Sequence, residues 1–167
     1  MACSCQKKGK LTCVTEAIWL TIGTPVSEAL EILTVNQPPR NASQSDSRLI
    51  DDLESFASRS EVMIMGDFNA PNIDWNLSSA PGSELNFDRR LLEAIHKRFL
   101  TQHVLSPTRI REGQQANCLD LVLTKAPDSV DVVNCLSPLG KSDHVVLQWE
   151  YSLFSVTDRN IIVKRNL

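Results

Sequence analysis

Val62-Met63-Ile64-Met65-Gly66-Asp67-Phe68-Asn69 is the stretch that decides the fold of this 167-residue chain. Its four leading apolar residues are typical of a buried strand, and the glycine after them predicts where that strand ends. The strand therefore delivers an acid, Asp67, and an amide, Asn69, to the edge of a sheet. Carboxylate and amide groups in such a place suit the binding of a divalent cation and the hydrolysis of a phosphate ester.

A second motif, Ser142-Asp143-His144, stands directly ahead of an apolar run, Val145-Val146-Leu147. It places an acid and an imidazole side by side at the start of another predicted strand. A third acid, Asp120, lies within the apolar stretch 119–124. Each acid alone has a simpler interpretation as a turn residue or an exposed strand position. The order of the three motifs along the chain is the more specific signal.

Composition indicates one globular domain with a real core, since 42% of residues are hydrophobic and 22% are charged. The net charge of −3 gives no overall positive field that would indicate a nucleic-acid partner. No apolar stretch approaches membrane-spanning length. The N-terminal residues 1–10 lack the apolar core of a secretory signal, and the five cysteines are an odd number. We therefore expect reduced thiols and an intracellular protein that is not secreted, in the nucleus or the cytoplasm.

Periodicity in the first half predicts a strand, a helix and a strand, which indicates an α/β fold. We expect a disordered leader at 1–15, a domain at 16–154 and a tail at 155–167. The long stretch 70–87 is predicted to be an irregular loop, and loops of that length are usually functional. The expected elements are strands at 16–22, 28–35 and 62–66, a helix capped by Ser47, a helix at 88–102, and short strands between 103 and 154.

Together, Gly66-Asp67-Phe68-Asn69, Leu119-Asp120-Leu121 and Ser142-Asp143-His144 resemble motifs of the endonuclease/exonuclease/phosphatase superfamily, which includes the DNase I-like nucleases. Ile73-Asp74-Trp75 and Thr108-Arg109-Ile110 are similar to its branch of endonuclease domains from non-LTR retrotransposons. The resemblance covers about residues 16–150. It implies a partial four-layer α/β sandwich, with two mixed β-sheets flanked by helices.

The resemblance also implies a mechanism. Asp67 would orient or deprotonate the attacking water, and Asn69 would hydrogen-bond the phosphate as it becomes pentacovalent. His144 would face the scissile phosphate, with Asp120 fixing its tautomer. Electrostatic stabilisation of the phosphate charge is the contribution that such a site supplies most strongly.

A divalent cation, Mg²⁺ or Mn²⁺, is implied as the cofactor, with Asp143 and Asp67 as its ligands. Arg109 and Asn36 are the candidate substrate-binding residues, although Asn36 stands where the family carries a tyrosine. The implied substrate is DNA, with no membrane and no obligate protein partner. A reverse transcriptase domain is a partner that we expect to have been lost.

Two family features find no match in the chain: an asparagine and a metal-binding glutamate on N-terminal strands. Glu16 is a poor substitute for that glutamate, because it matches a later strand that carries no ligand in the family. We therefore expect only the C-terminal part of the domain, and weak activity at best, since affinity for a hard cation falls with the number of carboxylates.

Two other functions stay open at this point. One is a phosphomonoesterase acting on phosphoinositides, or a sphingomyelinase-like enzyme, because one fold hosts several chemistries. The other is a non-catalytic remnant that keeps the fold without turnover. The features around Trp75 and Arg109 favour the nuclease among the enzymes.

Overall fold

The computed structural model describes residues 4–8, 16–24, 27–39 and 43–152. The predicted tail at 155–167 lies outside these ranges. In chain order the elements are β1 (Ser4–Lys8), β2 (Glu16–Thr24), β3 (Ser27–Asn36), α1 (Ser43–Phe56), β4 (Val62–Asp67), α2 (Phe87–Lys97), β5 (Thr101–Gln102), β6 (Asp120–Thr124), a 3-10 turn at Pro127–Ser129, β7 (Asn134–Leu136) and β8 (Val146–Gln148).

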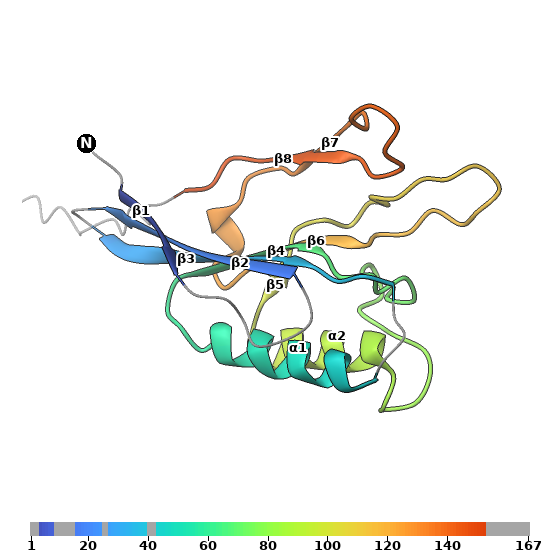
Figure 1. Cartoon of the computed structure of the whole chain (residues 1–167), viewed down its shortest axis with the longest axis horizontal. Helices are drawn as coiled ribbons and strands as arrows, with labels where there is room; N and C mark the ends of the chain where they lie inside the picture. The colour runs from blue at the N-terminus through green and yellow to red at the C-terminus, as the bar shows by residue number, and fades with distance from the viewer. Residues whose placement is uncertain (1–3, 9–15, 25–26, 40–42, 153–167) are drawn as a thin grey trace, which may run out of the picture.

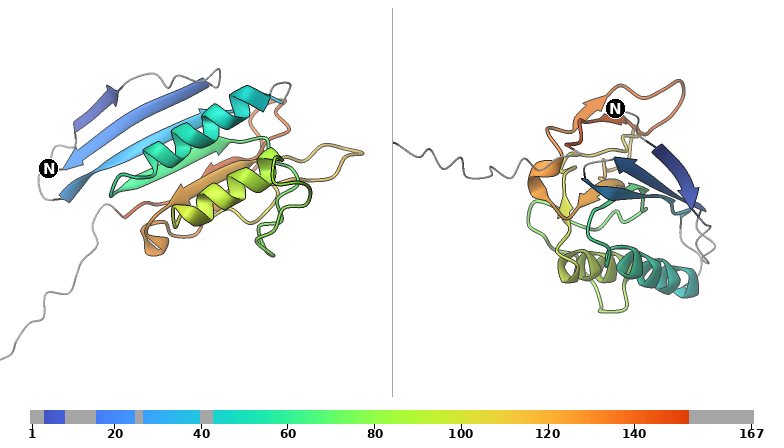
Figure 2. Two further views of the ribbon diagram at one scale, coloured as in Figure 1. Left: turned by 90° about the horizontal axis from the view of Figure 1, so that it is seen from below. Right: turned by 90° about the vertical axis from the view of Figure 1, so that its left-hand side faces the viewer.

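The elements form three layers in the described part of the chain (Figures 1 and 2). The central layer is a six-stranded sheet in the order β1-β2-β3-β4-β6-β5. Among the described strands, only β3 and β4 pair in parallel, and α1 forms the crossover between them, so the sheet is mixed. Both helices cover one face, and the two-stranded sheet of β7 and β8 lies over the other. The predicted α/β class is confirmed, with a second sheet that is antiparallel in the described residues.

Apolar side chains fill the space on both sides of the central sheet. Toward the helices, Leu53 of α1 and Leu91 of α2 are fully buried against Leu33 and Ile64 of the strands. A smaller cluster that includes Val122 occupies the opposite face, under the second sheet. Alternate residues of β3 and β4 thus face two different cores, which is why both strands carry long apolar runs. No helix within the described ranges is long and apolar enough to cross a membrane.

The helices begin and end elsewhere than the apolar periodicity predicts. α1 begins at Ser43, so Ser47, the predicted cap, lies inside the helix, where its hydroxyl accepts a hydrogen bond from Arg90 at 2.9 Å. α2 ends at Lys97 rather than 102. Phe99, which lies inside the predicted helix at 88–102, adopts a positive φ of 53° and is 84% exposed. This left-handed residue reverses the chain, so that the next residue, Leu100, turns into the core.

Part of the predicted leader is a strand. Residues 1–15 lack a strand-like alternation of apolar side chains, yet Ser4–Lys8 forms β1, antiparallel to β2. The rest of the leader lies outside the described residues. The physical reason is that an edge strand offers a row of unpaired backbone groups, and pairing with them requires no particular side-chain pattern. The expectation of disorder therefore fails over this segment.

Gly66 sits where the backbones of β3 and β4 come unusually close. It is the register partner of Val35 and has a φ of +130°. A Cβ atom at this position would lie 1.9 Å from the carbonyl oxygen of Val35. Only glycine fits here, because any side chain would clash with backbone and would also strain the positive φ.

We predict that Gly66→Ala lowers the free energy of unfolding by about 3 kcal/mol or more, since it combines backbone strain with overpacking. The matched control is Gly113→Ala, which has a φ of +73° but meets nothing within 4 Å, so it should cost only about 1 kcal/mol. Urea unfolding of both variants measures the difference. Equal losses would show that the close approach to Val35 contributes nothing.

Glu54 joins the two helices. Its carboxylate on α1 pairs with Lys97 of α2 at 2.7 Å and with Arg98, directly after α2, at 3.2 Å. The hydrogen bond from Lys97 lowers the pKa of Glu54, with further lowering by the charges of Lys97 and Arg98 against an opposing effect of burial. A lowered carboxyl pKa in the folded state stabilises the protein above the pKa of the unfolded chain, and this contribution is lost as pH falls through the folded value.

Glu54→Gln should therefore lower the free energy of unfolding at pH 7 by about 0.5–1 kcal/mol, the usual range for exposed to half-buried ion pairs. The difference from the wild type should shrink as the pH falls below about 4, because Glu54 becomes protonated. Glu93→Gln, which breaks an exposed pair with Arg89 inside α2 alone, is the control and should cost less. A difference that persists unchanged at pH 3 contradicts the assignment.

Candidate active site

Asp67 and Asp120 face each other at one end of the central sheet. Asp67 ends β4, Asp120 begins β6, and the two are register partners in the antiparallel pair. Side chains of register partners project to the same face of a sheet. Both carboxylates project to the face that carries the second sheet, because Met63 and Val122, at alternate positions on the same strands, belong to the core on that side.

His144 completes a compact group with these acids. Its Nδ1 lies 2.9 Å from Oδ2 of Asp120. An ionised carboxylate can only accept, so Nδ1 carries the hydrogen and Nε2 is left for another partner. One potential ligand atom from each of Asp67, Asp120 and His144 lies within 4.8 Å of the others. The structure thus brings together three residues that are far apart in the sequence and that the motifs single out.

The electrostatics of the group are set by its two carboxylates. Burial raises the pKa of Asp67 above its ordinary value, and the negative charge of Asp120 raises it further. The hydrogen bond from the backbone of Asn69 and the charges of His144 and Arg109 act in the opposite direction. Two carboxylates this close together repel each other, and a cation between them would relieve that repulsion.

Asn69 holds Asp67 in place. Its φ of 47° is left-handed, a conformation that asparagine tolerates better than most residues. Its backbone N–H donates to Oδ1 of Asp67 at 2.9 Å, and its side-chain amide donates to Oδ2 of Asp67 at 3.2 Å and to the carbonyl of Gln37 at 2.7 Å. Because these two acceptors already engage the amide hydrogens, a phosphate contact by Asn69 stays a prediction.

Asp143 lies beside His144 in the chain but outside the group of three. Its Oδ2 pairs with Arg109 at 2.9 Å and with Arg111 at 2.8 Å. The hydrogen bond from Arg109 holds the pKa of Asp143 below its ordinary value, and the charge of Arg111 adds to this. Its predicted role as a cation ligand, and that of Arg109 in substrate binding, stay predictions, since each side chain has the other as its immediate partner.

Thr108 is a positioning residue to which the sequence analysis gave no role. It is fully buried, and its hydroxyl oxygen accepts hydrogen bonds from the backbone N–H groups of Leu119 and Asp120, both at 3.0 Å. It therefore anchors the start of β6, from which the Asp120 side chain projects. The signal in the sequence is weak: a threonine before Arg109 in an otherwise polar loop.

Asn36 lies next to Asp67 at the end of the sheet, because the two are register partners across β3 and β4. Its exposed side-chain amide donates to Oε2 of Glu16 on β2 at 3.2 Å. Its predicted contact with substrate is not tested by this geometry. Glu16, a poor candidate from its place in the sequence, lies at the same end of the sheet as Asp67.

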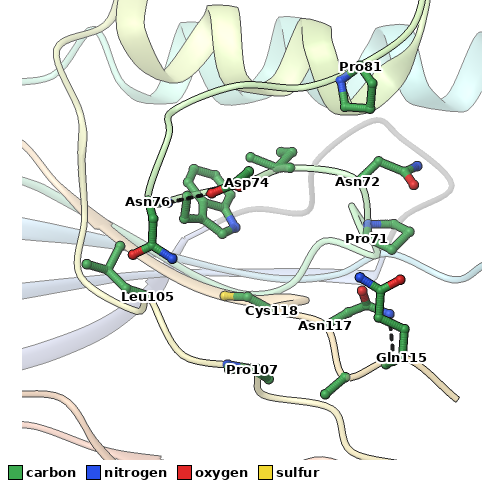
Figure 3. Close-up of a pocket in the computed structure, with 13 residues that line it drawn as sticks. Pro71, Asn72, Asp74, Asn76, Pro81, Leu105, Pro107, Gln115, Asn117 and Cys118 are labelled. Carbon is green, nitrogen blue, oxygen red and sulfur yellow. Dashed lines mark hydrogen bonds between the residues drawn. The ribbon is translucent and has the colours of Figure 1, made fainter.

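A cavity of about 560 Å³ flanks the site (Figure 3). One wall is the loop that carries Pro71, Asp74 and Asn76, and the other includes Leu105 and the segment 115–118. Pro71, on the first wall, comes two residues after Asn69 in the sequence, and Cys118, on the other wall, comes two residues before Asp120. The cavity is thus lined by segments that are close in sequence to two of the site residues.

Cys118, on the wall of this cavity, is not a nucleophile. Burial raises the pKa of its thiol to about 12, with a contribution from the charge of Asp120. The thiol donates to the carbonyl oxygen of Val104 at 3.3 Å. A thiol that stays protonated at neutral pH cannot attack a phosphate or a carbonyl efficiently. Cys118 is therefore no candidate for covalent catalysis at this site.

The donor set fits a hard divalent cation. Two carboxylates and an imidazole converge, and carboxylate oxygens are the ligands that Mg²⁺ and Mn²⁺ prefer. Asp67 and Asp120 are half-buried, so an ion between them would be only partly screened by water. Among the residues that the structure describes, neither a thiol nor a second imidazole joins the group.

Comparison with solved structures identifies the fold. The endonuclease domain of TRAS1, a telomere-specific non-LTR retrotransposon, superposes with a TM-score of 0.69 at 17% identity, covering 90% of this chain and 68% of that domain. An endonuclease/exonuclease/phosphatase from Beutenbergia cavernae superposes with a TM-score of 0.54 at 15% identity, covering 82% of this chain and 39% of the other. The predicted DNase I-like sandwich is thereby confirmed.

Sequence comparison identifies the family. Curated proteins provide no match. Residues 30–148, however, match the family described as endonuclease-reverse transcriptase, and this range holds every predicted site residue. Because the match spans more than half of its residues, the chain belongs to the endonuclease-reverse transcriptase family of the endonuclease/exonuclease/phosphatase superfamily.

Proposed function

We propose that this protein is a divalent-metal-dependent phosphodiester hydrolase that nicks DNA. The observation that carries the proposal is the convergence of Asp67, Asp120 and His144 within 4.8 Å, with His144 held by Asp120. These are the groups needed to prepare a water molecule and to balance the charge of a phosphate undergoing attack. The family to which the chain belongs supplies the reaction class.

Asp67 and its neighbouring carboxylate Asp120 would hold the cation. A bound Mg²⁺ or Mn²⁺ supplies Lewis-acid stabilisation of the negative charge that builds up on the phosphate. Asp67 would also accept the proton of the attacking water. Asn69 orients it for this role, because its backbone and side-chain N–H groups bond both oxygens of Asp67. A carboxylate held in this way can act as a general base without losing its geometry.

His144 would face the phosphate through Nε2. Its Nδ1 is engaged by Asp120, so the ring is oriented and Nε2 is the free nitrogen. In its charged form, with a hydrogen on both nitrogens, the imidazole would donate a hydrogen bond from Nε2 to a non-bridging phosphate oxygen and balance part of its negative charge. Thr108 supports the contact between His144 and Asp120, because its hydroxyl fixes the backbone of Asp120.

DNA is the substrate that we favour over a phosphomonoester. The support comes from the family assignment and from the likeness to a retrotransposon endonuclease domain, since a fold alone does not choose between substrates. Arg109 and Arg111, with side chains 28% and 52% exposed, stand beside the site, where they can contact neighbouring phosphates of a strand.

We expect the purified chain to convert supercoiled plasmid slowly to the nicked circle in Mg²⁺ or Mn²⁺, and not in EDTA. Asp67→Asn and His144→Gln should each lower the rate by about a hundredfold or more, the usual loss when one group that stabilises a transition state is removed. His96→Gln is the matched control. This exposed histidine on α2 bonds Ser78 and should leave the rate unchanged.

Three results would count against the proposal. Absence of nicking by the wild type in either metal would indicate a non-catalytic remnant. Hydrolysis of a phosphomonoester without nicking would identify the alternative enzyme class. Nicking that survives both Asp67→Asn and His144→Gln would belong to a contaminating nuclease.

A further inference from the structure

Gln37, the residue directly after β3, is bonded through its backbone to the segment that carries the candidate site. Its N–H donates to the carbonyl oxygen of Asp67 at 2.8 Å, and its own carbonyl oxygen accepts a hydrogen bond from the side-chain amide of Asn69 at 2.7 Å. The same amide donates to Oδ2 of Asp67 at 3.2 Å. The position of the Gln37 backbone therefore fixes how Asn69 presents its side-chain amide to the carboxylate of Asp67.

The side chain of Gln37 extends this connection to α1. Its Nε2 donates to Oδ1 of Asp46 at 3.0 Å. Both residues are buried, with Gln37 3% and Asp46 9% exposed. A hydrogen bond to a carboxylate is stronger than one between neutral groups, and little water is present here to compete for it. Asp46 lies in the first turn of α1, where the N-terminal end of the helix dipole stabilises a negative charge.

The residues that follow Gln37 leave the backbone with few ways to be held. Pro38 and Pro39 come next, and proline has no backbone N–H to donate. The pairing of β3 with β4 ends at Asn36, one residue before Gln37. These two prolines therefore cannot continue the strand pairing as donors. The bond to Asp46 holds Gln37 from the side of the helix at the point where the sheet stops holding the chain.

The pair of Gln37 and Asp46 has a simpler interpretation as a part of the core. Apolar side chains of similar size, however, would pack there without removing polar groups from water, so stability alone gives no reason for the pair. A hydrogen bond differs from apolar packing in that it sets direction as well as distance. Gln37 is bonded to α1 through its side chain and to two site residues through its backbone. A fixed orientation of Gln37 is thereby passed on to Asn69.

We propose that Gln37, held by Asp46, is a positioning residue for Asp67 and acts through Asn69. The proposal rests on the proposed function, in which Asp67 accepts the proton of the attacking water. α1 is then the fixed support against which the carboxylate is oriented. Because Gln37 and Asp46 are buried, the pair acts on the rate of the chemical step and not on the binding of DNA.

The first test measures kcat and KM for plasmid nicking by the full chain. A double variant, Gln37→Met with Asp46→Leu, removes the hydrogen bond and keeps side chains of similar size, so the fold should be retained. We expect kcat to fall about tenfold, the lower end of the range for groups that orient a site residue from outside the site, with KM unchanged. Asp46→Asn keeps an oxygen acceptor for Gln37 and should retain most of kcat. An unchanged kcat in the double variant, or an equal loss in Asp46→Asn, would overturn the proposal.

The second test shows whether the effect passes through Asn69. In an Asn69→Ala background, the double variant should cause no further loss of kcat, because the residue through which the pair acts has been removed. Losses that multiply would mean that Gln37 and Asp46 support the fold in general, and the positioning role would then be wrong.

Nuclear magnetic resonance distinguishes the failure of this proposal from the failure of the proposed function. The side-chain amide signals of Asn69 should shift in the double variant and stay in place in Asp51→Asn, the control, which changes an exposed acid of the same helix. Unchanged Asn69 signals in the double variant would overturn the proposal whether or not the protein nicks DNA. Shifted signals, in a protein whose wild type nicks no plasmid, would support the connection from α1 to Asn69 and show that the proposed function is wrong.

Discussion

The register of β4 between its two neighbours is the constraint on which the rest of the site depends. β4 pairs in parallel with β3 and antiparallel with β6, so Asp67 lies between Asn36 and Asp120. A slip by a single residue would turn Asp67 to the helix-covered face, because side chains alternate along a strand. Gly66 enforces the register, since the carbonyl of Val35 occupies the space of its missing side chain. The geometry of the candidate site is thus a consequence of backbone packing.

The central part of this arrangement is predictable from sequence because its signals are local. Val62 to Met65 is apolar on both faces, as a strand between two cores must be, and the glycine marks its end. The motifs around Asp67, Asp120 and His144 are equally local. Their order predicts convergence, and the 2.9 Å contact between His144 and Asp120 agrees with that prediction. Site residues that belong to short motifs of consecutive residues can therefore be found from the sequence.

The remaining features depend on contacts between segments that no local pattern reports. The hydroxyl of Thr108 accepts hydrogen bonds from Leu119 and Asp120, which are eleven and twelve residues away in the sequence. Glu16 reaches the end of the sheet only because β2 pairs with β3 in one particular register, so its position in the sequence alone made it a poor candidate. β1 likewise forms by backbone pairing, without a side-chain pattern. Pairing register is a tertiary property, and propensity carries little information about it.

The charges at this end of the sheet show which ligands the site can accept. Asp67 and Asp120 face each other without a basic partner for Asp67 in the described residues, whereas Asp143 is neutralised by Arg109 and Arg111. A phosphate diester carries negative charge and would be repelled by the two carboxylates alone. On the proposed function, a cation held by these carboxylates would offset that repulsion. Arg109 and Arg111 each use one nitrogen on Asp143, so their other N–H groups can contact phosphate while both pairs stay intact.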